Sequence, residues 1–185
     1  MGQFWTDRRG GKSTLHELGV RTPLIFQLPG VVPAGAMRED MISTEDLVPT
    51  LLAFAGVAAM PGLPGRSLHG AITAGAPVGR RVLVSEHLPR GEIPGGIWVR
   101  TPGWRYLGHN DGSEELFAIA RDPAEAHDLS DQYPELLPYF RAQAALWRRD
   151  IRRGNLAPLV CRAERRDARK CFRSRLVPGL RAGAR

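Results

Sequence analysis

Four short runs of β-type residues constrain the fold of this chain more than any other feature. They cover residues 81–86, 97–101, 104–109 and 115–120. The turns between them contain Pro-Gly-Gly, Pro-Gly and Asn-Asp-Gly, and turns of this kind reverse the chain between strands that pair side by side. The sequence therefore predicts a four-stranded antiparallel sheet.

A helix is predicted after these strands, over residues 134–153. Apolar residues recur there at intervals of three and four, which places them on one face of a helix. They are Leu137, Phe140, Ala144, Trp147 and Ile151. We expect this face to cover the sheet, so that residues 80–153 form a small antiparallel-sheet plus helix subdomain.

A shorter helix is predicted to begin after Asp46. Proline lacks an N–H and is tolerated in the first turn of a helix, so Pro49 fits a helix whose N-cap is Asp46. The Asp46 carboxylate is then expected to accept a hydrogen bond from the N–H of Val48, and Gly56 to end the helix in a left-handed conformation. Its apolar stripe is expected to comprise Leu47, Leu51, Leu52 and either Phe54 or Ala55.

The segment that joins these two parts is rich in glycine, alanine and proline. It covers residues 57–79 and is predicted to be an ordered connection with at most one helical turn, around residues 67–72. The division between a larger α/β domain in residues 1–79 and the subdomain in residues 80–153 is placed at its end.

The net charge of +7 belongs to the C-terminal end of the chain. Residues 1–147 carry 13 Lys and Arg against 16 Asp and Glu, whereas residues 148–185 carry 13 against 3. Residues 154–185 are therefore expected to form a basic, disordered tail. Nucleic acid is not an expected partner, because the tail lacks interleaved aromatic residues and the chain contains no recognisable binding module.

The cysteines and the apolar runs indicate which broad classes of protein the chain does not resemble. Both cysteines, Cys161 and Cys171, lie near the C-terminus, so the sequence indicates no disulfide framework. No run approaches membrane-spanning length, and the residues after Met1 lack the apolar core of a signal peptide. A soluble chain without a membrane partner is expected, with a cytoplasmic location if it is expressed as given.

The most specific motif lies in residues 10–30, which read GGKSTLHELGVRTPLIFQLPG. A glycine pair and Lys12 precede a short helical turn, and an apolar run follows at residues 23–28. This run has the unbroken apolar character of a strand buried on both faces, and we expect it to expose an unpaired edge and an apolar patch where neighbouring strands are lacking. A flexible ammonium beside glycine N–H groups suits a tetrahedral oxyanion, although a lone Gly-Gly-Lys is more often a solvated turn.

The motif resembles that of the sulfatases of the alkaline-phosphatase superfamily, G-K-x-T-x-Y-E-x-G-x-R-x-P followed by an apolar strand and P-G. Nine residues match in register: Gly11, Lys12, Thr14, Glu17, Gly19, Arg21, Pro23, Pro29 and Gly30. In the family this lysine reaches the sulfate group, so the resemblance implies sulfate binding for Lys12. His16 stands where the family has tyrosine, and it is a candidate substrate-binding residue beside the lysine loop.

The resemblance extends over roughly residues 10–150. Residues 42–57 resemble the family segment S-x-x-D-x-x-P-T-L-L-x-x-A-G-V, with a later G-x-S-L, and residues 115–129 resemble E-L-Y-D-L followed by D-P-x-E-x-x-N-L. Asp128 departs from the family asparagine, at a place where strand-end hydrogen bonds are expected. The implied fold is α/β, the C-terminal part of an alkaline-phosphatase-like sulfatase, with residues 1–79 ending the catalytic domain.

The resemblance also implies a reaction, the hydrolysis of a sulfate ester of a small molecule or glycan. The family uses calcium or another divalent cation and a formylglycine nucleophile, and these are implied for a full-length enzyme. No metal ligand or cofactor is predicted within this chain, which is expected to begin just after the metal site and to be inactive on its own. Residues 161–165 formally fit the nucleophile string C-x-[PA]-x-R, but they follow the last helix and we interpret the match as coincidence.

Two alternatives remain open. One is a phosphodiesterase or phosphonate hydrolase of the same superfamily, because phosphoryl groups require clamps similar to those for sulfate. The other is a non-catalytic remnant whose basic tail binds polyanions.

Overall fold

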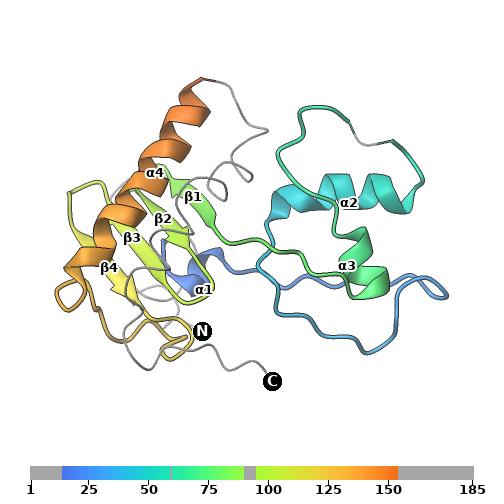
Figure 1. Ribbon diagram of the computed structural model, residues 1–185, viewed down its shortest axis with the longest axis horizontal. Helices are drawn as coiled ribbons and strands as arrows, with labels where there is room; N and C mark the ends of the chain where they lie inside the picture. Colours follow the sequence, from blue (N-terminus) through green and yellow to red (C-terminus); the bar gives the residue numbers. More distant parts are fainter. Residues whose placement is uncertain (1–13, 59, 90–94, 154–185) are drawn as a thin grey trace, which may run out of the picture.

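The chain forms two parts (Figure 1). The sheet region contains the strands and the long helix within residues 83–152, and the smaller helical region contains the short helices within residues 44–74. The structure is a computed structural model that describes residues 14–58, 60–89 and 95–153. The short helices are α1 (Glu17–Val20), η1 (Thr44–Asp46), α2 (Leu47–Phe54), α3 (His69–Ala74) and η2 (Pro134–Leu136). Within these ranges, no helix combines the length and the apolar character that crossing a membrane requires.

The predicted antiparallel sheet is confirmed. Its strands are β1 (Leu83–His87), β2 (Gly96–Arg100), β3 (Arg105–His109) and β4 (Glu114–Phe117), and they pair in the order β1-β2-β3-β4. Each strand overlaps its predicted range, although β4 ends three residues earlier than expected. Asp128 accepts a hydrogen bond from the Leu116 N–H at 2.9 Å, which is the kind of strand-end contact expected for this position.

The predicted helix α4 (Leu137–Arg152) covers one face of the sheet (Figure 1). The core between them consists of Val82, Ile97, Val99, Tyr106, Leu116, Leu137, Phe140 and Ala144. The rings of Tyr106 and Phe140 are stacked, with 5.7 Å between centroids. Ile151 was wrongly assigned to the packed stripe: it is 38% exposed, since it lies in the last turn, beyond the residues that pack on the sheet.

The other face of the sheet carries both apolar and charged residues. Side chains alternate between faces along a strand, so the neighbours of the α4-facing residues point the opposite way. Leu107 and Phe117 lie there and form a second buried cluster with Leu15 and Ile119. A Cβ on Gly96 would approach Leu15 Cδ1 to 2.5 Å, so the absence of a side chain at this position lets Leu15 reach the sheet.

Helix α2 begins and ends where the sequence predicts, but its buried face differs. Pro49 lies in the first turn, and Gly56 follows the helix with a φ of 68°. The buried residues of α2 are Pro49 and Thr50, whereas Leu51 is exposed, so the predicted apolar stripe is wrong. Thr50 Oγ1 accepts a hydrogen bond from the Leu68 N–H at 2.8 Å, so this polar side chain belongs to the buried face beside Pro49. The predicted helical turn at 67–72 is present as α3, shifted by two residues.

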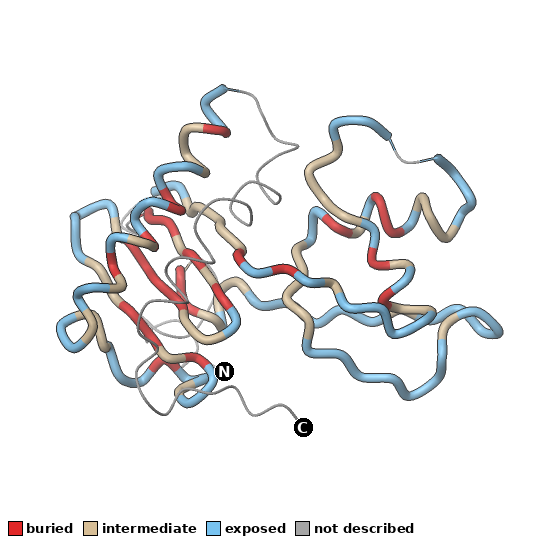
Figure 2. The backbone as a smooth tube through the Cα atoms, viewed as in Figure 1, coloured by how far each residue is buried: buried red, intermediate tan, exposed pale blue. Residues whose placement is uncertain are grey.

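The strand predicted for residues 23–28 is absent. These residues have no regular secondary structure, and Ile25 is 88% exposed. Figure 2 shows burial concentrated in the sheet, whereas residues 21–40 are largely exposed. An apolar run becomes a strand only where another strand accepts its backbone hydrogen bonds, and none of the described residues pairs with this run.

Candidate functional site

The candidate site starts from the motif of Lys12, which lies outside the described residues. The described chain begins two residues later, at Thr14, and the first side chains with known surroundings are those of Leu15, His16 and Glu17. They lie against the sheet face opposite α4 (Figure 1). The contacts of residues 15–17 therefore define the candidate site. The division of the chain at residue 80 stays a prediction.

His16 is buried, with only 6% of its surface exposed. Its Nδ1 lies 2.8 Å from Oε2 of Glu125, and its ring lies 5.8 Å from that of Phe117. An ionised carboxylate only accepts hydrogen bonds, so Nδ1 carries the proton of this contact. The structure thus gives His16 a protein partner, and its predicted contact with substrate stays a prediction.

Glu125 is the residue on which this segment converges. Its Oε2 also accepts a hydrogen bond from the Glu17 N–H at 3.0 Å. Its Oε1 lies 2.8 Å from Nε of Arg105, an ion pair whose angles fall outside those of a hydrogen bond. Burial opposes ionisation of Glu125, but the hydrogen bonds from His16 and Glu17 and the charge of Arg105 outweigh it and hold its pKa below the usual value.

Arg105 joins the segment to β3 and is 1% exposed. Its Nη1 donates to Glu17 Oε2 at 2.8 Å, and its Nη2 donates to the Leu15 carbonyl oxygen. The guanidinium also lies over the Trp98 ring, 4.8 Å from its centroid. Burial lowers the pKa of Arg105, and the charges of Glu125 and Glu17 partly offset that shift.

Arg100 completes the group, which we call the Glu125 cluster: His16, Glu17, Arg100, Arg105 and Glu125. Arg100 on β2 stands directly opposite Arg105 on β3, and its Nη1 lies 4.0 Å from Glu17 Oε2. Like charges directly opposite each other destabilise a sheet, so this pair requires nearby anions. Glu17 and Glu125 supply the negative charge.

Sequence reasoning missed Glu17, Arg105 and Glu125 as members of one cluster, although part of the signal was present. Alternation along the predicted strands puts Arg100, Arg105, His109 and Glu115 on the same face as Leu107 and Phe117. Charged residues interleaved with large apolar ones indicate a face that is covered and not solvated. The covering segment lies about 90 residues upstream, and nothing in the local pattern identifies it.

His109 and Glu115 form a smaller pair at the border of the cluster. His109 Nε2 lies 2.9 Å from Glu115 Oε2, and His16 Nε2 lies 3.7 Å from the same oxygen. The hydrogen bond that His109 donates to Glu115 raises the pKa of His109 above its usual value, against the opposing effect of burial. This pair therefore brings a titratable imidazole close to the Glu125 cluster.

A second buried ion pair holds the helical region together. Arg80 donates from Nη1 to Asp46 Oδ2 at 2.5 Å and from Nη2 to Asp46 Oδ1 at 2.7 Å. Asp46 also accepts the N–H groups of Ser43 at 2.8 Å and Arg66 at 2.9 Å. The prediction that its carboxylate caps α2 is wrong, because no hydrogen bond joins it to that helix. The carboxylate accepts from Arg80, Ser43 and Arg66 instead.

The same contacts connect residues 42–57 with the later G-x-S-L at residues 65–68, the second segment that resembles the family. Gly65 precedes Arg66 and passes so close to the chain before α2 that a Cβ there would lie 1.9 Å from the Glu45 carbonyl oxygen. Burial opposes ionisation of Asp46, but its hydrogen bonds with Arg80, Arg66 and Ser43 outweigh it and lower its pKa. These residues are structural, since every acceptor site of the Asp46 carboxylate is taken by the protein.

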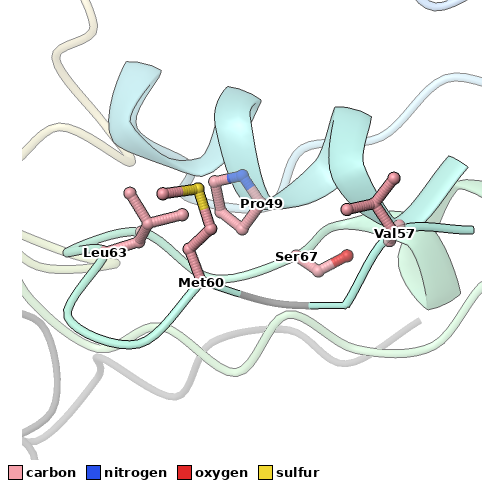
Figure 3. A pocket seen from close by; sticks show the side chains of 7 residues that line it. Pro49, Val57, Met60, Leu63 and Ser67 are labelled. Atoms are coloured by element: carbon pink, nitrogen blue, oxygen red, sulfur yellow. The ribbon is translucent and has the colours of Figure 1, made fainter. Parts of the chain in front are cut away.

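A small pocket lies beside α2 (Figure 3). It has a volume of about 180 Å³ and is lined by Pro49, Ala53, Val57, Met60, Leu63, Gly65 and Ser67. None of these side chains titrates near neutral pH, and the pocket contains no member of the Glu125 cluster. It provides no acid–base group, and the hydroxyl of Ser67 accepts a hydrogen bond from the His69 N–H at 3.2 Å.

The described residues do not fit the divalent cation that the resemblance implies for a full-length enzyme. Across residues 14–58, 60–89 and 95–153, no three His, Cys, Asp or Glu side chains are grouped so that they could hold a metal ion. We therefore derive no chemical step through a metal from this part of the chain. The string at 161–165 and the predicted basic tail lie outside the described residues.

Comparison with protein families identifies one match. Residues 4–141 match the family model described as N-sulphoglucosamine sulphohydrolase, C-terminal. The match includes Lys12, the Asp46 region and the whole sheet. It ends within α4, so it covers both buried ion clusters.

Curated relatives match a large part of the chain. Arylsulfatase K of Homo sapiens is 26% identical over 142 residues, which cover 68% of this chain and 25% of that protein. Arylsulfatase G of Mus musculus is 33% identical over 85 residues, covering 43% of this chain and 16% of that protein. The chain thus spans about a quarter of the length of arylsulfatase K.

A solved structure gives the corresponding match in three dimensions. The crystal structure of Ps i-CgsB superposes with a TM-score of 0.62 at 27% identity, over 71% of this chain and 30% of that one. The same protein in complex with k-i-k-neocarrahexaose gives a TM-score of 0.55 at 26% identity, over 64% and 27% of the two chains.

Proposed function

The chain belongs to the sulfatase family, within the C-terminal part of these proteins, and we propose that it contributes this part of an enzyme that hydrolyses sulfuric esters. The observation that carries the proposal is the family match over residues 4–141, a range that includes the residues of the lysine motif. This match supports the activity of a sulfatase-like hydrolase.

Lys12 is the proposed sulfate ligand. Its ammonium is a compact point charge on a flexible stem, and it follows two glycines whose backbone N–H groups can also face an anion. A cation at this place stabilises the negative charge on the sulfate oxygens as the ester bond breaks. His16 is proposed to assist substrate binding only through its place beside this loop.

The proposed substrate class is a sulfated sugar. The description of the matched family names an N-sulphoglucosamine sulphohydrolase, an enzyme that acts on a sulfated sugar. A structurally similar protein was crystallised with k-i-k-neocarrahexaose. Both observations support a carbohydrate substrate.

The test places this chain in the context of a whole sulfatase. In a chimera, residues 4–141 replace the matching segment of human arylsulfatase K, and hydrolysis of a chromogenic aryl sulfate is measured. We expect Lys12→Ala to lower kcat/KM by roughly 10²–10³-fold, comparable to the loss of an oxyanion donor. Arg152→Ala, introduced in a chimera extended to residue 153, is the control, because it removes one positive charge from the exposed end of α4.

Two results would overturn the proposal. An unchanged kcat/KM in Lys12→Ala would return Lys12 to a solvated turn. A chimera that melts cooperatively but hydrolyses an aryl phosphate diester and no aryl sulfate would favour the phosphodiesterase alternative.

A further inference from the structure

We propose that Glu125 is a positioning residue for the sulfate-binding lysine. Through its carboxylate the C-terminal sheet region fixes residues 15–17, which follow Lys12 in the chain and anchor the segment that carries it. The inference rests on the proposed role of Lys12. It assigns to Glu125 a function that neither the family match nor the names of the relatives contain.

The first argument is convergence. Oε2 of Glu125 binds both the His16 Nδ1 and the Glu17 N–H, at 2.8 and 3.0 Å, so a single oxygen holds two consecutive residues. One contact is to a side chain and the other to the backbone, and together they fix both the ring and the chain direction. Lys12 comes four residues before His16 in the sequence, so at most about 14 Å of chain separates their Cα atoms.

The second argument is the route to the sheet. The other oxygen of Glu125 pairs with Arg105 at 2.8 Å, and Arg105 in turn binds Glu17 and the Leu15 carbonyl oxygen. Arg105 belongs to the central strand β3 and is buried, so it is held by the sheet. Arg105 thereby attaches Leu15 and Glu17 to the sheet, and Glu125 adds the contact to His16 between them.

The third argument is the backbone of Glu125 itself. It has a φ of 54° and is the one non-glycine residue with positive φ among the described residues. Glycine or asparagine adopts this conformation more easily, so a glutamate at this place pays a conformational cost. Its side chain is only 2% exposed and is used for the contacts above. The position requires the carboxylate, since the turn alone would favour a different residue.

The arrangement matters for catalysis because a sulfate ligand acts only at the correct distance. A displacement of about 1 Å at a positioning group can reduce a rate by on the order of 10²-fold. Glu125 does not reach the substrate in this scheme and is not a catalytic residue. It acts through residues 15–17 and the lysine that precedes them.

The first experiment measures the position of the segment in the 185-residue chain, without any assay of activity. Amide hydrogen exchange is followed by NMR in wild type, Glu125→Gln and the control Glu135→Gln, which changes an exposed glutamate at the start of η2–α4. We expect the Glu17 amide to exchange about tenfold faster or more in Glu125→Gln, while amides of β2 and β3 change less than about twofold. The control should match wild type.

Three outcomes of this experiment overturn the proposal. Unchanged exchange at Glu17 would show that the carboxylate does not hold the segment. Loss of protection throughout the sheet would make Glu125 a determinant of the whole fold and not of one segment. A Glu125→Gly variant, which relieves the positive φ and removes the carboxylate, must also expose Glu17; wild-type protection in that variant would mean that only the turn conformation matters.

The second experiment connects the segment to the lysine, in the chimera described above. We expect Glu125→Gln to lower kcat/KM by roughly 10–100-fold. The double variant Lys12→Ala/Glu125→Gln should be no slower than Lys12→Ala alone, because a residue that acts through Lys12 has nothing left to position. Fully additive losses would overturn the positioning role.

The two proposals fail separately. If Lys12→Ala has no effect on kcat/KM, the proposed function of Lys12 fails whatever the exchange data show. If Lys12→Ala is slow but Glu125→Gln behaves as wild type in both experiments, the sulfate-binding role stands and the positioning role fails.

Discussion

Two buried groups of charges hold the described chain, and they are built differently. In the helical region, Asp46 forms a closed pair with Arg80, and two backbone N–H groups take its remaining acceptor sites. In the sheet region, the charges of the Glu125 cluster are shared: Arg105 contacts both Glu17 and Glu125, and Glu125 contacts three different residues.

The separation along the chain explains the difference. Asp46 and Arg80 are 34 residues apart and hold together loops of one region. Glu125 and His16 are 109 residues apart and join the segment after Lys12 to the sheet. A closed pair suffices to fix a local fold, whereas a shared cluster can hold several residues of a distant segment at once.

The largest effect is expected from breaking the closed pair. Asp46→Asn leaves the buried guanidinium of Arg80 without a counter-charge, and removing one partner of a buried pair typically costs about 3–5 kcal/mol. The free energy of opening of the helical region, measured from exchange of the Leu68 amide, should fall by this amount. Exchange in the sheet should be almost unchanged.

A matched variant tests the cause. In Asp46→Asn/Arg80→Met the unpaired charge is also removed, so part of the lost free energy should return. A loss below about 1 kcal/mol in Asp46→Asn would show that the pair contributes no more than an exposed salt bridge.

The next effect concerns the close approach beside Asp46. A Cβ at Gly65 would meet the Glu45 carbonyl oxygen at 1.9 Å, so Gly65→Ala forces the backbone apart. We expect it to destabilise the helical region by about 1–3 kcal/mol, as overpacking does. Gly103→Ala in the sheet region is the control, because nothing lies within 4 Å of its added Cβ and its φ is not positive. Equal unfolding free energies for the two variants would contradict this close approach.

A third prediction compares how often the two regions open. Arg38 lies in the exposed chain before α2, whereas Arg105 is buried in β3. Trypsin should therefore cleave after Arg38 at least about tenfold faster than after Arg105. Mass spectrometry of the timed digest gives both rates, and similar rates would mean that the regions unfold together.

The smallest effect is expected from His109 and Glu115. The hydrogen bond with Glu115 raises the pKa of His109 above 6.5, so protonated His109 is favoured in the folded state. Its contribution to stability is fully present below pH 6.5 and is lost as the pH rises through the folded pKa. We expect only a few tenths of a kcal/mol, since the pair is partly exposed. NMR titration gives the pKa directly, and Glu115→Gln should return it toward 6.5; a pKa that does not move would contradict the assignment.

Much of the sheet region was predictable because its signals are local. Glycine- and proline-containing turns between short β-type runs predict antiparallel neighbours, and the three- and four-residue spacing of Leu137, Phe140 and Ala144 predicts a helix with one packed face. Ile151 was the exception, since the same spacing continues past the end of the surface it packs on. The lysine motif predicted the family, which the match over residues 4–141 confirms.

The candidate site was predictable only in part. Lys12 and His16 were identified from the motif, and the role of Lys12 stays a prediction. The sequence identified Glu125 only as a match to the D-P-x-E pattern of the family. Its role could not be predicted, because its partners lie on β3 and in residues 16–17. Its effect depends on which distant groups the fold brings to its carboxylate.

The sequence by itself determined the order of strands and helices in residues 81–153, the limits of α2 and the family, because each follows from spacing within a short window. The tertiary structure decided which faces are buried, that Asp46 binds Arg80 and not the helix it precedes, and that the run at 23–28 does not form a strand. These outcomes depend on contacts between residues far apart in the chain. A hydrogen bond or a buried charge is satisfied by whichever partner the fold places within about 3 Å, and local spacing contains no information about that partner.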